Sequence, residues 1–138
     1  MFFGFLYSIL PADLRNLLLS LYDELIDNLM LIVLEGLDGA GKSTQVKKLR
    51  NYLETHFGSL EYIHFPRYDA PVYGDLISRF LRGDFGSNET VHPQLVALLF
   101  AEDRHGAAPG IKNTLDEGGN VLLDRYVYSN IAYQCAKL

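Results

Sequence analysis

The sequence is poor in cysteine and in positive charge, and each shortage excludes a class of protein. Its single cysteine, Cys135, cannot form an intrachain disulfide and is typical of a protein from the reducing cytoplasm. Zinc sites built on paired cysteines are excluded, and the four histidines are scattered along the chain. Lys and Arg number 12 against 17 Asp and Glu, and the net charge of −5 argues against nucleic-acid and anionic-membrane partners.

The N-terminal region also lacks the features of a targeting or membrane segment. Residues 1–10 are apolar but too short to span a bilayer, and they have neither the basic start nor the small-residue cleavage site of a signal peptide. Residues 11–29 predict an amphipathic helix, whose acidic face has the wrong sign for an anionic membrane. We therefore expect residues 1–29 to be an N-terminal extension, packed on the domain or disordered rather than a membrane anchor. Residues 30–138 are expected to form the domain.

What the sequence does contain is a phosphate-binding loop. Residues 36–44 fit the pattern G-x-x-x-x-G-K-[ST], with an apolar run of strand length before them and a helical pattern after them. In this arrangement the backbone N–H groups and the helix N-terminus bind phosphate. Lys42 reaches the β- and γ-phosphates, and the Ser43 hydroxyl ligates Mg²⁺. The flanking strand and helix disfavour the alternative of a chance glycine turn. The predicted ATP- and phosphate-binding residues are Gly36, Leu37, Asp38, Gly39, Ala40, Gly41, Lys42, Ser43 and Thr44.

The rest of the domain alternates strand and helix patterns. The helix after the loop is expected to have one apolar face, made of Val46, Leu49, Tyr52 and Leu53. Strands are predicted at 30–35, 61–65 and 120–124, and further helices at 75–81, 93–104, 109–118 and 127–138, with Pro93 and Pro109 each opening a helix. Such alternation predicts an α/β fold with a parallel sheet.

Charged side chains follow the predicted strands directly. Arg67 and Arg125 come just after the second and third strands, and ligands of an open parallel sheet bind at the carboxyl ends of its strands. Two guanidinium groups there can hold an acceptor phosphate in line with the γ-phosphate of ATP. Asp124 closes the apolar run 121–123, as the aspartate of a Walker B motif does, and can orient Mg²⁺ through water.

Four further segments resemble the thymidylate kinase family, in sequence order and at the family's spacing. They are F-P-R-Y at 65–68, L-L-F-A-E-D-R at 98–104, D-R-Y at 124–126 and S-N-I-A-Y-Q at 129–134. A phosphate-binding loop alone occurs in many unrelated enzymes, but the five segments together are specific. The resemblance covers residues 30–138 and is to bacterial members most of all. It implies a parallel sheet with flanking helices, of the nucleoside-monophosphate kinase type and strand order 2-3-1-4-5, truncated at its C-terminus. The lid and the last two strands would be absent, which leaves the strand before the loop as an open edge.

The resemblance also implies a reaction and a set of site residues. Members of the family transfer the γ-phosphoryl group of ATP to dTMP with Mg²⁺, and the resemblance implies a homodimer. The implied catalytic residues are Lys42, Asp38 and Arg125, and the implied metal residues are Ser43 and Asp124. The implied dTMP-binding residues are Asp38, Phe65, Arg67, Tyr68, Phe100, Arg104, Arg125, Ser129, Asn130, Tyr133 and Gln134.

Several alternatives stay open on the sequence. Periodicity alone places Phe100 in the core with Arg104 at its edge, and only the motif match favours a base-binding role. The helix surface is the corresponding alternative for Tyr133 and Gln134. Another P-loop nucleoside or nucleotide kinase is a rival function, although the motifs at 65–67 and 98–104 argue against it. A second rival is a non-catalytic nucleotide-binding fragment, because the lid would be missing and the loop has Gly39-Ala40 where some members have arginine.

Overall fold

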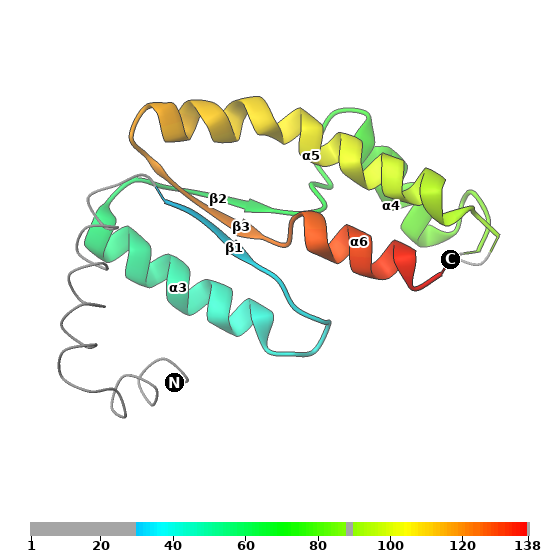
Figure 1. The fold of residues 1–138 in the computed structure, drawn as a ribbon, viewed down its shortest axis with the longest axis horizontal. Coiled ribbons are helices and arrows are strands. Elements are labelled where there is room, and N and C mark those ends of the chain that lie inside the picture. The colour runs from blue at the N-terminus through cyan, green and yellow to red at the C-terminus, as the bar shows by residue number, and fades with distance from the viewer. Residues whose placement is uncertain (1–29, 88–89, 138) are drawn as a thin grey trace.

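The computed structural model describes residues 30–87 and 90–137, which fold around a three-stranded sheet (Figure 1). In chain order, the elements are β1 (Leu31–Leu34), α3 (Lys42–Phe57), β2 (Leu60–His64), α4 (Tyr73–Arg82), α5 (Pro93–Asp116), β3 (Asn120–Asp124) and α6 (Val127–Cys135). The strands and most of the helices lie within a few residues of their predicted positions. The predicted extension at 1–29 lies outside the described residues.

The sheet is parallel, and its strand order is β1-β3-β2. The central strand, β3, is short and apolar because helices cover both of its faces, and the side chains of Val121, Leu122 and Leu123 are fully buried. β1 is an edge strand of the described sheet, and Leu31 and Val33 on it are 46% and 36% exposed. The order agrees with the first three strands of the expected topology, and the prediction of an open edge at the P-loop strand is confirmed for the described residues.

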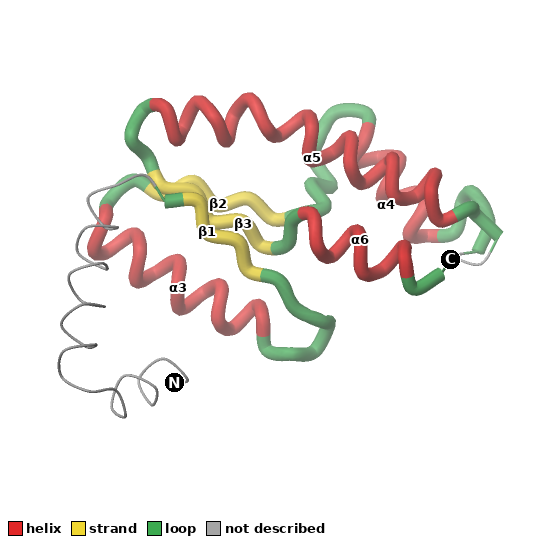
Figure 2. Tube along the Cα trace, viewed as in Figure 1, coloured by secondary structure: helices red, strands yellow, loops and turns green. Residues whose placement is uncertain are grey.

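Helices lie on both faces of the sheet (Figures 1 and 2). α3 packs on one face through Val46 and Leu53, while Tyr52, predicted to share that face, is 41% exposed and stacks on the His56 ring at 4.0 Å. α5 packs on the other face, where a buried cluster joins it to β3 and to the residue after β2. The cluster consists of Phe65, Ala107, Ile111, Val121 and Leu123.

The prediction of two helices at 93–104 and 109–118 is wrong, because α5 runs unbroken from Pro93 to Asp116 with Pro109 in its interior. Pro109 removes the hydrogen bond that a backbone N–H at this position would donate to the His105 carbonyl, and its ring crowds that carbonyl. Ala107 and Ile111, one on each side of it, are both buried against the sheet. Packing of these neighbours holds the helix together across the proline.

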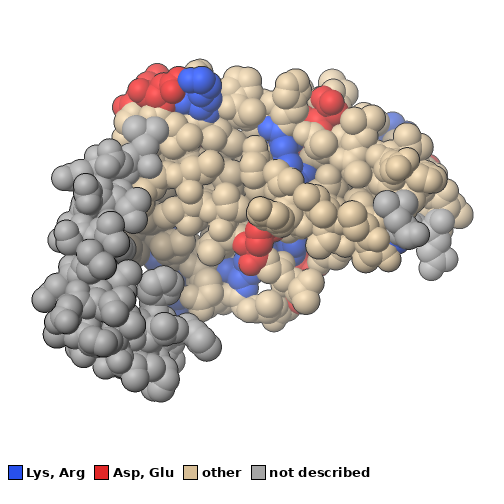
Figure 3. Space-filling view, viewed as in Figure 1, with Lys and Arg blue, Asp and Glu red and all other residues tan. Residues whose placement is uncertain are grey.

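The described surface is mixed in charge and in polarity. On the face that Figure 3 shows, the Lys and Arg side chains of the described residues lie in small, separated groups. Among the described residues, no helix is both long and apolar enough to cross a membrane.

Candidate active site

The phosphate-binding loop joins β1 to α3 in the predicted way. Gly39 and Gly41 both have φ of +80°, a left-handed conformation that residues with a side chain rarely adopt. Gly41 is the N-cap of α3, and Lys42 is the first residue of the helix. The loop therefore turns its backbone toward the helix N-terminus, where N–H groups and the helix dipole favour an anion.

Lys42 is held by the carboxylate at the end of β3. Its Nζ lies 3.0 Å from Oδ1 of Asp124, which is 4% exposed. The other carboxylate oxygen is 3.1 Å from Nδ1 of His64 and 3.3 Å from the hydroxyl of Tyr62. Burial raises the pKa of Asp124, but hydrogen bonds and charge from Lys42 and His64 outweigh it and lower the pKa overall. Asp124 is thus a carboxylate that aims the loop lysine.

The donor set near the loop suits Mg²⁺ of the kind that nucleotide phosphates carry. Among the described residues no cluster of three or more His, Cys, Asp or Glu side chains could hold a metal by itself. Mg²⁺ in kinases needs only one or two protein oxygens, because phosphates and water fill the remaining positions. The Ser43 hydroxyl fits that requirement as a direct ligand. The Asp124 carboxylate, which lies 3.0 Å from Nζ of Lys42, fits it as a group that acts through water.

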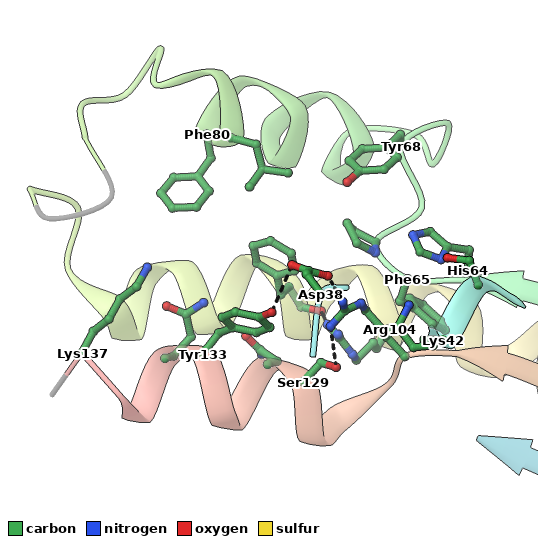
Figure 4. A pocket seen from close by; sticks show the side chains of 17 residues that line it. Asp38, Lys42, His64, Phe65, Tyr68, Phe80, Arg104, Ser129, Tyr133 and Lys137 are labelled. Carbon is green, nitrogen blue, oxygen red and sulfur yellow. Dashed lines mark hydrogen bonds and ion pairs between the residues drawn. The ribbon is translucent and has the colours of Figure 1, made fainter. Parts of the chain in front are cut away.

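A cavity of about 540 Å³ opens beside the loop (Figure 4). It is bounded by the loop, the segment after β2, and helices α4, α5 and α6. Every predicted dTMP-binding residue except Arg67 lines it, together with Lys42 and Ser43. The lining residues are Asp38, Lys42, Ser43, His64, Phe65, Pro66, Tyr68, Phe80, Leu81, Phe100, Arg104, Arg125, Ser129, Asn130, Tyr133, Gln134 and Lys137.

One side of the cavity is polar and centres on Arg125. This residue has φ of +67°, and its guanidinium forms an ion pair with Asp38 and donates through Nη1 to Oγ of Ser129 at 3.2 Å. The hydroxyl of Tyr133 donates to the other Asp38 oxygen at 3.2 Å. Figure 4 shows the hydroxyl of Tyr133 on α6 pointing toward Asp38 of the loop. The structure thus brings together residues from three of the predicted motifs.

The guanidinium of Arg104 is nearly buried and lies over the Phe65 ring, with Cζ 5.4 Å from the ring centroid. Arg104 is 7% exposed, its Nε donates to the Tyr126 carbonyl at 2.6 Å, and its Nη1 donates to the Phe100 carbonyl. Burial lowers the pKa of Arg104, and the charge of Asp103 opposes this only in part. The Phe100 ring meets Phe80 of α4 edge to face, with centroids 6.5 Å apart.

Two amide side chains on α6 present unpaired acceptors in the same region. Nδ2 of Asn130 donates to the Ala97 carbonyl at 2.9 Å. Its Oδ1 and the Oε1 of Gln134 are buried without a hydrogen-bond partner among the described residues. Buried acceptors are almost always paired in folded proteins, so these two oxygens are exceptions among the described residues.

Arg67 is the predicted dTMP-binding residue that the structure does not bring into the cavity. Its Nε lies 2.9 Å from Oδ1 of Asp103, its backbone nitrogen donates to Oδ2 at 3.0 Å, and its Nη2 donates to the Asp103 carbonyl at 2.6 Å. Asp103 is fully buried. Arg67 is therefore committed to an ion pair that ties the F-P-R-Y segment to α5.

Sequence reasoning missed three polar residues that hold the site together: Glu35, His64 and Asp103. Glu35 follows β1 directly, and its carboxylate accepts from the backbone nitrogens of Tyr126 and Ser129 at 2.9 and 3.3 Å and from the Ser129 hydroxyl. Burial raises the pKa of Glu35, but these hydrogen bonds outweigh it and lower the pKa overall. Two of these residues could have been found by their position in the sequence, because Glu35 and His64 are polar residues at the ends of apolar strands.

The parallel sheet, the phosphate-binding loop and the adjoining cavity define a P-loop α/β protein of the nucleotide kinase type. The family model for thymidylate kinase matches residues 34–138. The chain belongs to the thymidylate kinase family.

Individual relatives agree with this assignment. Thymidylate kinase from Mycobacterium tuberculosis is 41% identical over 109 residues, which are 79% of this chain and 50% of that protein. Among solved structures, thymidylate kinase from Candida albicans has a TM-score of 0.66 at 38% identity and covers 80% of this chain and 45% of its own. Thymidylate kinase from Ehrlichia chaffeensis has a TM-score of 0.63 at 28% identity, with 78% of this chain and 59% of its own covered. The chain spans about half the length of the curated relatives it matches.

Proposed function

We propose that this chain carries the phosphate-donor loop and the acceptor site of an ATP:dTMP phosphotransferase. The observation that supports the proposal most is the single cavity that Lys42 and Ser43 share with Phe100, Arg104, Asn130 and Gln134. A nucleoside monophosphate that spans this cavity has its phosphate near the loop and its base near the aromatic and amide side chains.

The polar side of the cavity suits the acceptor phosphate. The Arg125 side chain is 11% exposed, whereas Asp38, its ion-pair partner, is 83% exposed at the rim. A phosphate can therefore replace Asp38 on the guanidinium, which leaves Asp38 with Tyr133 beside the sugar. Tyr68 also lines the cavity and offers a second donor. In this account Arg67 supports the segment from outside the cavity.

The transfer step needs alignment more than covalent help from the protein. A phosphate oxygen of dTMP attacks the γ-phosphorus of ATP, the bond from that phosphorus to the β–γ bridging oxygen breaks, and ADP leaves with the electron pair. Lys42 neutralises charge on the β- and γ-phosphates, and Arg125 holds the attacking phosphate in line. Mg²⁺, held by Ser43 and oriented by Asp124, supplies further charge neutralisation when it is bound.

The apolar side of the cavity suits a pyrimidine with a ring N–H. Phe100 offers a face for stacking, and the part of the Arg104 guanidinium not held by the Tyr126 and Phe100 carbonyls can donate to a ring carbonyl. The unpaired oxygens of Asn130 and Gln134 need a donor, and N3–H of thymine is one. Tyr133 beneath the sugar favours a deoxyribose, because a 2′-hydroxyl would meet its ring.

The test is a panel of nucleoside monophosphates incubated with γ-labelled ATP and Mg²⁺, with the labelled diphosphates separated and counted. We expect dTMP to be the preferred acceptor, ahead of dUMP, dCMP and dGMP. Faster labelling of a purine or cytosine nucleotide would favour another P-loop nucleotide kinase. Saturable dTMP binding without any labelled product would favour the non-catalytic nucleotide-binding fragment.

The family resemblance also supports a homodimer. α5 carries two leucines one turn apart, Leu95 and Leu98, which are 64% and 58% exposed. A second copy that packs on this face would bury both, and burial of each side chain would contribute about 1.5–3 kcal/mol at most.

A further inference from the structure

Glu35 occupies the junction between the two halves of the site. It follows β1, precedes the first glycine of the loop, and reaches across to the N-terminus of α6. Its Oε1 accepts from the backbone nitrogens of Tyr126 and Ser129, and its Oε2 accepts from the Ser129 hydroxyl. One carboxylate thus satisfies backbone donors at a helix start that would otherwise lack partners.

The direction of these hydrogen bonds decides what Ser129 offers to Arg125. A serine hydroxyl has one hydrogen, and a carboxylate can only accept. Ser129 must therefore donate its hydrogen to Glu35, which leaves its oxygen lone pairs for Nη1 of Arg125 at 3.2 Å. The negative charge of Glu35 is what orients the hydroxyl in this way.

The end of β1 also holds the backbone of the arginine. The Arg125 nitrogen donates to the Leu34 carbonyl at 2.8 Å, and the next nitrogen, of Tyr126, donates to Glu35. Arg125 has φ of +67° at this point, and its side chain reaches Asp38 of the loop. Leu34, the last residue of β1, and Glu35, the next residue, therefore fix the backbone around Arg125. Glu35 also fixes the guanidinium of Arg125 through the Ser129 hydroxyl.

We propose that Glu35 is a positioning residue that orients the Arg125 guanidinium for the acceptor phosphate through the Ser129 hydroxyl. The proposal rests on the function proposed above. It connects the two phosphate sites, because Glu35, which comes just before the phosphate-binding loop, also orients Arg125, which holds the acceptor phosphate.

Glu35→Gln tests the proposal with little change in size. The amide can keep one oxygen on the backbone donors, but its NH₂ group would face the Ser129 hydroxyl and take its lone pair away from Arg125. We expect dTMP affinity, measured by calorimetry on the 138-residue chain, to fall about tenfold, as for a lost charge-assisted hydrogen bond. Thymidine, which has no phosphate, should bind as it does to the wild type. An equal loss for both ligands would mean that Glu35 acts on the fold alone and would overturn the proposal.

Glu54→Gln is the matched control. Glu54 pairs with Arg50 on the exposed surface of α3, away from the cavity. This variant should bind both ligands like the wild type.

Ser129→Ala tests the relay separately and leaves the backbone cap by Glu35 in place. It should reproduce the selective loss of dTMP affinity, and the double variant Glu35→Gln/Ser129→Ala should lose no more than the worse single variant. Additive losses would show that the two residues act independently and would contradict the relay. If Glu35→Gln does not fold, the dTMP-to-thymidine comparison in Ser129→Ala decides the matter.

An NMR measurement separates this inference from the proposed function. The Nη hydrogens of Arg125 should be restrained in the wild type and should exchange faster in Glu35→Gln and Ser129→Ala, but not in Glu54→Gln. If this holds while no dTMP binds to the wild type, the proposed function fails, and only the orientation of Arg125 by Glu35 stands. Unchanged Arg125 signals in Glu35→Gln would overturn the positioning role whatever binds.

Discussion

The guanidinium of Arg125 is paired to one side by Asp38 and to the other by Ser129, and both partners lie at the cavity wall. Preorganised charge of this kind is worth more in transition-state stabilisation than a flexible surface arginine, because little reorganisation is needed during transfer. The same reasoning separates Arg125 from Arg67, whose charge is neutralised by a fully buried Asp103.

Arg125→Ala should therefore lower kcat/KM for dTMP by at least about 10²-fold, measured in protein that shows the proposed phosphoryl transfer. The control is Arg82→Ala, which removes an exposed arginine paired only with Asp84. Steady-state kinetics with ATP saturating measure the effect. A change of less than about threefold would assign Arg125 to structure.

The carboxylate of Glu35 should also make stability depend on pH in acid. Its pKa is lowered in the folded protein from an ordinary value of 4.5, so the folded state favours the charged form. This contribution is complete above the ordinary pKa and is lost as pH falls through the folded pKa. The free energies of unfolding of the wild type and of Glu35→Gln, measured with denaturant, should differ most at neutral pH. This difference should shrink below pH 4.5. A difference that does not change with pH would contradict the assignment of a charged Glu35 cap.

At the scale of elements, α5 shows how packing overrides a local signal. Pro109 predicts a helix start, yet the helix continues because the residues around it are buried on the sheet. Pro93, at the true start, occupies the position where a missing N–H has no cost.

The two prolines give a matched pair of variants. Pro109→Ala should stabilise the protein by about 1–3 kcal/mol, because it restores a hydrogen bond to the His105 carbonyl inside an intact helix. Pro93→Ala should give no gain, since that nitrogen has no partner within the helix. Chemical denaturation of both variants measures the difference. Destabilisation by Pro109→Ala would show that the proline shapes the helix in a way that an unbroken α5 does not explain.

The elements that the sequence predicts best are those with a local cause. The loop glycines and the apolar run of β3 follow from patterns within a few residues, whereas the order of the strands was implied only by the family resemblance. Tyr52 was assigned to the wrong face, since α3 buries only the narrower stripe of Val46 and Leu53. The partners of Arg67 and the reach of Glu35 depend on residues 36 and 94 positions away, so no local pattern could reveal them.

At the scale of the whole molecule, the described sheet has an edge at β1, and α5 has exposed leucines. Both are apolar surfaces that a second copy of the chain could cover. The exposed leucines of α5 form the surface that we propose for the homodimer.

Leu95→Glu/Leu98→Glu should convert a dimer to a monomer in light scattering after size exclusion, because two charges cannot be buried there unpaired. Ile131→Glu, on α6 and 50% exposed, is the control and should leave the oligomeric state unchanged. Dissociation by the control but not by the α5 variant would place the interface elsewhere.

The central claim is that the cavity beside the loop is a dTMP site, and a crystal structure of the protein with dTMP tests it most directly. We expect one dTMP in the cavity, with its thymine against Phe100 and within reach of Arg104 and Asn130. Its phosphate should lie on Arg125 in place of Asp38. A nucleotide bound outside this cavity, or one with its phosphate at Phe100 and its base at the loop, would contradict the account.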